Sequence, residues 1–207
     1  MRQNRSGRSV VQSSLDFKAW LLQPPTVEQA RPARCPQCDA ASCPLGGRLQ
    51  LHGHGLRERQ VCGPLSPDGD ATEESLLGRR YRCIRCSAVI IVVPREIRGR
   101  WQYSAAAIAF ALALWGLVLA TTRDVRKRVS PRATHGVSGI FGWKTVRRWA
   151  GAVRERRLFP ATPSPGKAAT LRQVAASAAA ACAACASPLT RAFAIEQRAF
   201  LGAAQSA

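Results

Sequence analysis

Acidic residues are scarce in this chain, which has 12 Asp and Glu against 31 Lys and Arg over 207 residues. The formal net charge of +19 and the isoelectric point near 11.3 predict a polyanionic partner, with nucleic acid as the first candidate. A composition rich in arginine and alanine also arises from genomic base composition. The charge therefore indicates a class of ligand without identifying it.

The carboxylates needed for two-metal catalysis are missing from the second half of the chain. After residue 100 the acids are Asp124, Glu155 and Glu196, and no series of predicted strands surrounds them to align carboxylates around two metal ions. We therefore expect a non-enzymatic protein. A metal-dependent nuclease or strand-transfer enzyme is disfavoured.

Long apolar runs are also few. Polar residues from Gln12 to Asp16, together with Lys18, interrupt any run of signal-peptide length, so we expect a cytoplasmic, nucleoid-associated chain. Residues 101–122 are uncharged, lie between Arg100 and Arg123, and are long enough to cross a membrane. Their high alanine content favours a packed helix, and a small membrane protein with a cytosolic zinc-binding domain stays an alternative.

Six of the eight cysteines lie between residues 35 and 86, and four of them form two CxxC pairs, Cys35-Pro-Gln-Cys38 and Cys83-Ile-Arg-Cys86. Each pair places two thiolates on a tight turn, where both reach one metal ion at about 2.3 Å in a tetrahedral site. The spacing predicts one structural zinc ion per chain, bound by Cys35, Cys38, Cys83 and Cys86. A complete Cys₄ shell leaves no position for water or substrate.

The 44 residues between the two pairs exceed the roughly 15 to 20 of compact zinc sites. A strand from Arg48 to Val61 and an acidic loop from Pro64 to Gly78 account for the excess. Further strands over 79–82 and 88–93 make residues 34–99 a predicted three-stranded zinc ribbon. Such a small sheet buries too little apolar surface to be stable alone, so metal binding is expected to supply much of its folding free energy.

Other potential donors match no zinc template, although a second site or an exchanged ligand stays open. They are Cys43, Cys62, His52 and His54. Cys182 and Cys185 form a third CxxC within an alanine run, where residues three apart merely share a helix face. We interpret this last pair as structurally neutral.

Residues 100–159 change to alanine-rich and amphipathic patterns that predict three helices. Ser104 and Thr122 are the expected N-caps of the first two. The three helices span residues 105–119, 123–129 and 143–157. Their order favours a helix-turn-helix, with a connection over 130–142 that exceeds the usual three or four residues.

The third predicted helix places Val146, Trp149, Ala150 and Val153 on one face and basic residues on the other. In a recognition helix, side chains near the start contact bases and phosphates of the major groove. The expected DNA contacts are Lys144, Thr145, Arg147 and Arg148 on this helix, and Arg126, Lys127 and Arg128 on the preceding one. The alternative is that the basic side is an ordinary solvated face.

Two flanking segments complete an α+β organisation. Residues 1–33 are a predicted basic arm with one short helix that ends at Pro24-Pro25. Residues 160–207 are a predicted proline-containing linker and an alanine-rich helical tail with little core of its own.

Three groups of residues together resemble the N-terminal region of bacterial insertion-sequence transposases. They are the first CxxC followed by His54-Gly-Leu-Arg57, the run Arg80-Tyr-Arg-Cys-Ile-Arg-Cys86 ending at Pro94, and the helical runs Tyr103–Ile108, Val125–Val129 and Trp143–Trp149. The resemblance covers about residues 34–157 and implies a zinc ribbon and a helix-turn-helix that recognise element ends. We expect no counterpart of that family's catalytic RNase H-like domain in this sequence. Double-stranded DNA is the expected partner, and an RNA-binding zinc-ribbon protein is the alternative.

Overall fold

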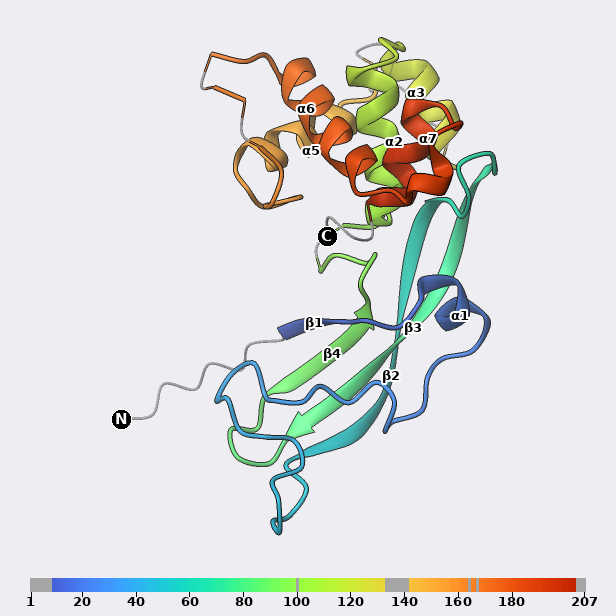
Figure 1. Ribbon diagram of the computed structural model, residues 1–207. Helices are drawn as coiled ribbons and strands as arrows, with labels where there is room; N and C mark the ends of the chain where they lie inside the picture. Colours follow the sequence, from blue (N-terminus) through green and yellow to red (C-terminus); the bar gives the residue numbers. More distant parts are fainter. Residues whose placement is uncertain (1–8, 100, 133–141, 164, 167, 204–207) are drawn as a thin grey trace. The chain divides into compact units, whose positions relative to one another are not determined.

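The computed structural model describes residues 9–99, 101–132, 142–163, 165–166 and 168–203 (Figure 1). Two compact units divide the chain. The first, here called the β unit, comprises residues 1–61 and 74–101, and the second, the helical unit, comprises 62–73 and 102–207. The described residues form one four-stranded sheet and six α-helices, so the expected α+β class is confirmed.

The sheet has the strand order β1-β4-β3-β2 (Figure 1). Its strands are β1 (Ser9–Ser13), β2 (Leu51–Pro64), β3 (Ala71–Cys83) and β4 (Val89–Pro94). Strands β2, β3 and β4 lie where the sequence predicts three strands, and β1 adds a fourth from the N-terminal arm. β1 pairs in parallel with β4, with Ser9 opposite Ile90, whereas β3 and β4 are antiparallel.

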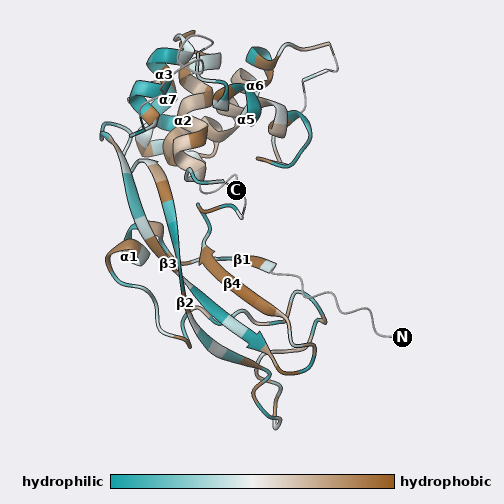
Figure 2. Ribbon diagram, turned by 180° about the vertical axis from the view of Figure 1, so that it is seen from behind, coloured by the Kyte–Doolittle hydropathy of each residue, from teal (hydrophilic) through white to brown (hydrophobic). Residues whose placement is uncertain are grey.

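Strand β3 is longer than the sequence suggested. The expected acidic loop over 64–78 is confined to a short turn, because β3 already begins at Ala71. Leu76 and Gly78 within this stretch are buried, and a Cβ on Gly78 would lie 3.3 Å from side-chain carbons of Ile91 and Val93. The acidic residues conceal a strand because β3 buries alternate positions and exposes the others. Figure 2 shows a further contrast, since β4 is apolar whereas β2 and β3 are more hydrophilic.

The N-terminal arm contributes the largest core side chain of the β unit. Helix α1 (Phe17–Leu22) is capped by Asp16, whose carboxylate accepts a hydrogen bond from the Ala19 N–H. Trp20 on this helix is 2% exposed, and its indole N–H donates to the Leu77 carbonyl at 2.9 Å. The short helix predicted in the arm is therefore present, and it packs as part of the core.

The helical unit is built around α2 (Ala105–Gly116), in which every residue except Ala106 is buried. Four helices accompany it: α3 (Thr122–Val129), α5 (Thr145–Arg154), α6 (Leu171–Ala184) and α7 (Ile195–Gly202). Ser104 caps α2 as expected, whereas Thr121 caps α3 in place of the predicted Thr122. Figure 2 shows apolar residues along α2 and hydrophilic residues on α3.

The alanine-rich tail was predicted to have little core of its own. Its helices α6 and α7 instead pack against α2 and against each other. Glycines make this packing close. A Cβ on Gly116 would lie 2.4 Å from the Ala176 backbone nitrogen, and one on Gly202 would lie 1.9 Å from the Cys182 carbonyl oxygen. Weakly hydrophobic alanines thereby form a dense core through close backbone approach.

The uncharged stretch over residues 101–122 is divided between α2, a turn and the first residue of α3. Among the described residues, no helix has the length and apolar character needed to cross a membrane.

Replacing Gly116 by alanine is expected to destabilise the helical unit by about 1–3 kcal/mol, because the new methyl group overlaps the backbone of α6. Gly151 on α5 is the matched control, since a Cβ there meets no atom within 4 Å. Gly151→Ala should stabilise by about 0.5–1 kcal/mol through helix propensity. Urea unfolding of both variants measures the difference, and equal effects would contradict the close α2–α6 approach.

Candidate metal centre and basic helical surface

The four cysteines of the two CxxC pairs meet in the β unit. Their sulfur atoms all lie within 4.8 Å of one another. The Sγ atoms of Cys35 and Cys86 are 3.7 Å apart, as are those of Cys38 and Cys83. A tetrahedral site with metal–sulfur bonds of about 2.3 Å requires sulfur–sulfur separations of about 3.8 Å. The donor set and its spacing therefore fit one zinc ion, and the predicted Cys₄ group is confirmed.

The turns formed by the two CxxC pairs, here called the knuckles, share one backbone pattern. The Asp39 N–H donates to the Cys35 carbonyl at 2.9 Å, and the Ser87 N–H donates to the Cys83 carbonyl at 2.9 Å. Asp39 and Ser87 both adopt the left-handed conformation, with φ of 55° and 60°. Each turn thus brings two sulfurs to the same side of the chain. Arg34 holds the first turn through its guanidinium, whose Nε donates to the Asp39 carboxylate at 2.7 Å.

Ionisation of the thiols is unequal across the group. Burial raises the pKa of Cys35, and partial burial together with hydrogen bonds to the neighbouring sulfurs raises the pKa of Cys86 to about 12. Burial also disfavours the Cys83 thiolate, but hydrogen bonds from the backbone N–H groups of Cys86 and Arg85 outweigh it and lower the pKa of Cys83. A divalent cation bound here would displace the remaining protons, since thiolates are the ligands.

The spare donors do not join this group. Cys43 is exposed, Cys62 belongs to the helical unit, and neither lies with His52 or His54 in a metal-binding cluster of the described residues. The third CxxC lies on α6 and at its C-cap, with Cys182 buried and Cys185 exposed.

Replacing Cys38 by serine is expected to abolish stoichiometric zinc binding and to lower the thermal stability of the β unit, because one of four thiolates is lost. The control is Cys43→Ser, which removes an exposed thiol outside the group. Metal analysis of the purified variants should find about one zinc per chain in the control. Retention of zinc by Cys38→Ser would contradict the assignment of ligands.

A second candidate site lies in the helical unit, where basic residues gather on α3 and α5. Residues 123–157 contain 11 Lys and Arg against two acids. The predicted contact residues are exposed, except that Arg126 and Thr145 are only partly so. The guanidinium groups of Arg147 and Arg148 have no hydrogen-bond or ion-pair partner within the described part of the chain. Both are therefore available to an external anion.

The three predicted contacts on α3 are partly engaged within the unit. Arg126 donates to the Arg132 carbonyl at 2.9 Å. The Lys127 ammonium lies 4.0 Å from the Asp124 carboxylate. The Arg128 guanidinium sits 5.6 Å from the centre of the Phe110 ring. These contacts orient the side chains and leave their positive charge largely unneutralised.

An aromatic cluster fixes α5 beneath its basic side. Tyr103, Trp143 and Trp149 meet edge to face, with ring centroids 5.0, 5.2 and 6.0 Å apart. Trp149 lies on the face of α5 that the sequence predicted to be apolar, and Val146, Ala150 and Val153 on that face are also buried. The predicted amphipathic character of this helix is therefore confirmed.

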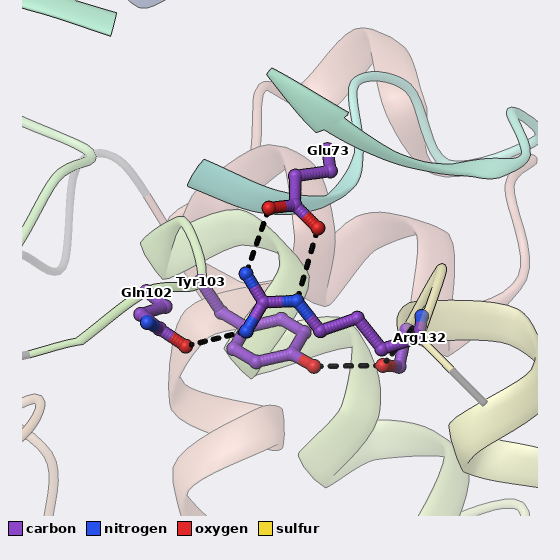
Figure 3. Close-up of polar contacts among 5 residues, drawn as sticks. Glu73, Gln102, Tyr103 and Arg132 are labelled. Carbon is purple, nitrogen blue, oxygen red and sulfur yellow. Dashed lines mark hydrogen bonds and ion pairs between the residues drawn. The ribbon is translucent and has the colours of Figure 1, made fainter. Parts of the chain in front are cut away.

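A polar network connects the start of α2 to the end of α3 (Figure 3). The Tyr103 hydroxyl donates to the Ser130 hydroxyl at 2.8 Å, and Ser130 is the C-cap of α3. The Arg132 guanidinium binds the two carboxylate oxygens of Glu73 at 2.9 and 2.8 Å and the Gln102 side-chain oxygen at 3.2 Å. The guanidinium of Arg132, which follows α3, thus joins Glu73 of β3 to Gln102, which precedes α2.

The predicted turn between α3 and α5 falls mainly on residues 133–141, which lie outside the described residues. Helices α3 and α5 each pack against α2.

The hydrogen bonds from Arg132 lower the pKa of Glu73 below its usual value of 4.5. A lowered folded-state pKa means that the stabilisation is present above pH 4.5 and is lost as the pH falls through the folded value. Glu73→Gln should therefore destabilise the helical unit near neutral pH, and the difference from the unaltered chain should shrink in acid. Unfolding curves over a pH series measure it, with Glu74→Gln as control. A difference independent of pH would contradict the ion pair.

The chain matches none of the protein-family models, curated proteins or solved structures with which it was compared. Its function has to be inferred from the metal centre and the basic surface themselves.

Proposed function

We propose that this protein is a non-enzymatic, transposase-related or regulatory protein that binds double-stranded DNA through the basic side of α5. The supporting observation is the pair Arg147 and Arg148, which are exposed and unpartnered among the described residues, on a helix whose opposite face is buried. The aromatic cluster packs against the buried face of the helix that carries this pair and does not engage the two guanidinium groups. An unneutralised pair of arginines on such a helix suits phosphate and base-edge recognition.

The charge of the helical unit supports this proposal. The unit contains 15 Lys and Arg against six Asp and Glu. Binding to duplex DNA would release the cations condensed on its phosphates, which makes affinity strongly dependent on salt. An uncharged or cationic ligand would offer no such gain.

The dimensions of α5 are compatible with the major groove. An α-helix with its side chains is about 10–12 Å across, so a major groove about 12 Å wide admits it, and the ten residues of α5 extend about 15 Å. In this proposal α2, α3 and α5 act as the three helices of a helix-turn-helix, with α5 as recognition helix and α3 beside the phosphate backbone. Thr145 and Lys144 at the start of α5 would add contacts there. The resemblance to the N-terminal region of insertion-sequence transposases points to the same function.

The metal centre has a structural role in this proposal. Zinc held by Cys35, Cys38, Cys83 and Cys86 would complete its coordination with protein ligands alone. It would fix both knuckles and the ends of β3 and β4, as in a zinc ribbon. No reaction is assigned to this site.

The double variant Arg147→Gln/Arg148→Gln is expected to weaken binding to a labelled duplex by roughly tenfold or more at about 0.1 M salt, because two phosphate or base contacts are lost. Arg191→Gln is the control, since Arg191 is an exposed arginine at the end of a short 3₁₀ helix, outside α3 and α5. Fluorescence anisotropy measures both affinities.

Unchanged affinity of the double variant would remove α5 from the interface. Competition with a duplex RNA of the same sequence separates the two nucleic acids: stronger competition by RNA than by DNA would favour an RNA-binding protein in place of the proposed function.

A further inference from the structure

The sheet of the β unit presents two different faces. On one face, Arg79 and Tyr81 of β3 point toward the segment that follows α1. The Arg79 Nε donates to the Pro25 carbonyl at 2.6 Å, and the Tyr81 hydroxyl donates to the Val27 carbonyl at 2.6 Å. This face is therefore covered by the chain itself.

The register of the strands places the intervening arginines on the opposite face. Arg80 lies opposite Ile91, and Arg82 lies opposite Val89 in the antiparallel pairing of β3 and β4. Val10 of β1 lies opposite Ile91 on its other side. Residues directly opposite one another project from the same face of a sheet. The two arginines thus flank an aliphatic strip made by β1 and β4.

Strand β2 adds basic residues next to this strip. Arg57 and Arg59 line a hollow of about 300 Å³ together with Val10, Ile91 and Val93. Val10 is 38% exposed, so the strip is open to solvent at its edge. We call the set Arg57, Arg80 and Arg82, with the neighbouring Val10 and Val89, the arginine face.

Arg59 is already engaged within the β unit. Its guanidinium donates to the Arg98 carbonyl at 2.7 Å, to the Gly99 carbonyl at 3.2 Å and to the Trp101 carbonyl. Burial lowers its pKa. Because its guanidinium already has these internal acceptors, Arg59 is not counted as part of the arginine face.

The side chains of Arg57, Arg80 and Arg82 differ from that of Arg59 in having no hydrogen-bond or ion-pair partner in the described part of the chain. The neighbouring acid, Glu58, instead accepts a hydrogen bond from the Ser75 hydroxyl at 2.6 Å. Three positive charges on one open face of a small unit repel one another, which weakens folding unless an external anion compensates them. In the described part of the chain, no carboxylate forms an ion pair with these three guanidinium groups.

We propose that the arginine face is a second DNA-binding surface, which binds the phosphate backbone of the duplex contacted by α5. This inference rests on the proposed function. Arg80 and Arg82 lie two residues apart on one strand, about 6.8 Å, so both can bind neighbouring phosphates of a single strand. A guanidinium group can donate two hydrogen bonds to phosphate oxygens, and the exposed Val10 side chain on the same face suits contact with deoxyribose.

An acidic protein is the competing occupant, and the observations favour the nucleic acid. Both units carry a positive excess, since the β unit has 16 Lys and Arg against six Asp and Glu. A ligand with charge along its whole length can use both units at once, and a duplex is such a ligand. The face also lacks an exposed aromatic anchor of the kind that dominates protein–protein interfaces.

The test uses the full-length, zinc-loaded chain and a labelled duplex. Arg80→Gln/Arg82→Gln should weaken binding by roughly tenfold or more at about 0.1 M salt and should lower the slope of log affinity against log salt by about 2. Arg57→Gln is a separate variant that does not border the knuckles. Lys18→Gln on α1 is the single-charge control for Arg57→Gln. Zinc content and thermal unfolding confirm that each variant is folded.

The outcomes separate this inference from the proposed function. Loss of affinity in the Arg80/Arg82 and Arg57 variants, with Lys18→Gln unchanged, supports the second surface. If only the Arg147/Arg148 variant loses affinity, the proposed function stands and the second surface is overturned. If only the Arg80/Arg82 variant loses affinity, the sheet binds DNA and α5 does not. Equal small losses in all variants, Lys18→Gln included, would show nonspecific charge attraction and overturn the inference.

Discussion

Four sulfur atoms within 4.8 Å of one another join two segments of the β unit that are separated by 44 residues of sequence. The unit needs this junction because its apolar interior is modest: residues 52–58 of β2 are exposed, and α1 supplies the one buried tryptophan among its described residues. Structural zinc sites contribute on the order of 10 kcal/mol to folding, which is comparable with the whole stability of a small domain. The position of the strands, and with it the arginine face, depends on the junction.

The helical unit is stabilised by different means. Its core consists of short side chains and glycines that allow α2, α6 and α7 to approach closely, together with the aromatic cluster under α5. Neither feature requires charged residues, so arginines can remain on the outer side of α5 without internal partners. In the proposed function, stability and DNA binding thus use opposite faces of the same helix. The ion pair between Arg132 and Glu73, in contrast, uses a charge for structure.

Local patterns were sufficient to predict the two CxxC turns whose cysteines cluster, the Ser104 cap and the buried face of α5, because each depends on residues close together in sequence. Features that depend on distant partners were missed. The parallel pairing of β1 with β4 joins residues about 80 positions apart, and the register between them has no local signal. The first residues of β3 were assigned to a loop because they include two glutamates, of which Glu73 is exposed and Glu74 partly buried.

The packing of the alanine-rich tail and the exposure of the arginine face also depend on contacts between residues far apart in the sequence, so neither could be predicted from local patterns. Alanines at 171–184 have low hydrophobicity, and their burial follows from Gly116 and Gly202, whose importance appears only once the helices meet. The alternation Arg80-Tyr81-Arg82 is visible in the sequence and signals a strand with two different faces. Which face is open depends on Val27 accepting the Tyr81 hydroxyl, a contact between residues 54 positions apart.

The most direct test of the account is the salt dependence of duplex DNA binding by the zinc-loaded chain, measured by fluorescence anisotropy between about 50 and about 300 mM salt. If α5 and the arginine face both bind phosphates, log affinity should fall against log salt with a slope of roughly −4 or steeper. A slope near zero, or no binding at the lowest salt, would contradict the proposal that this basic protein binds DNA.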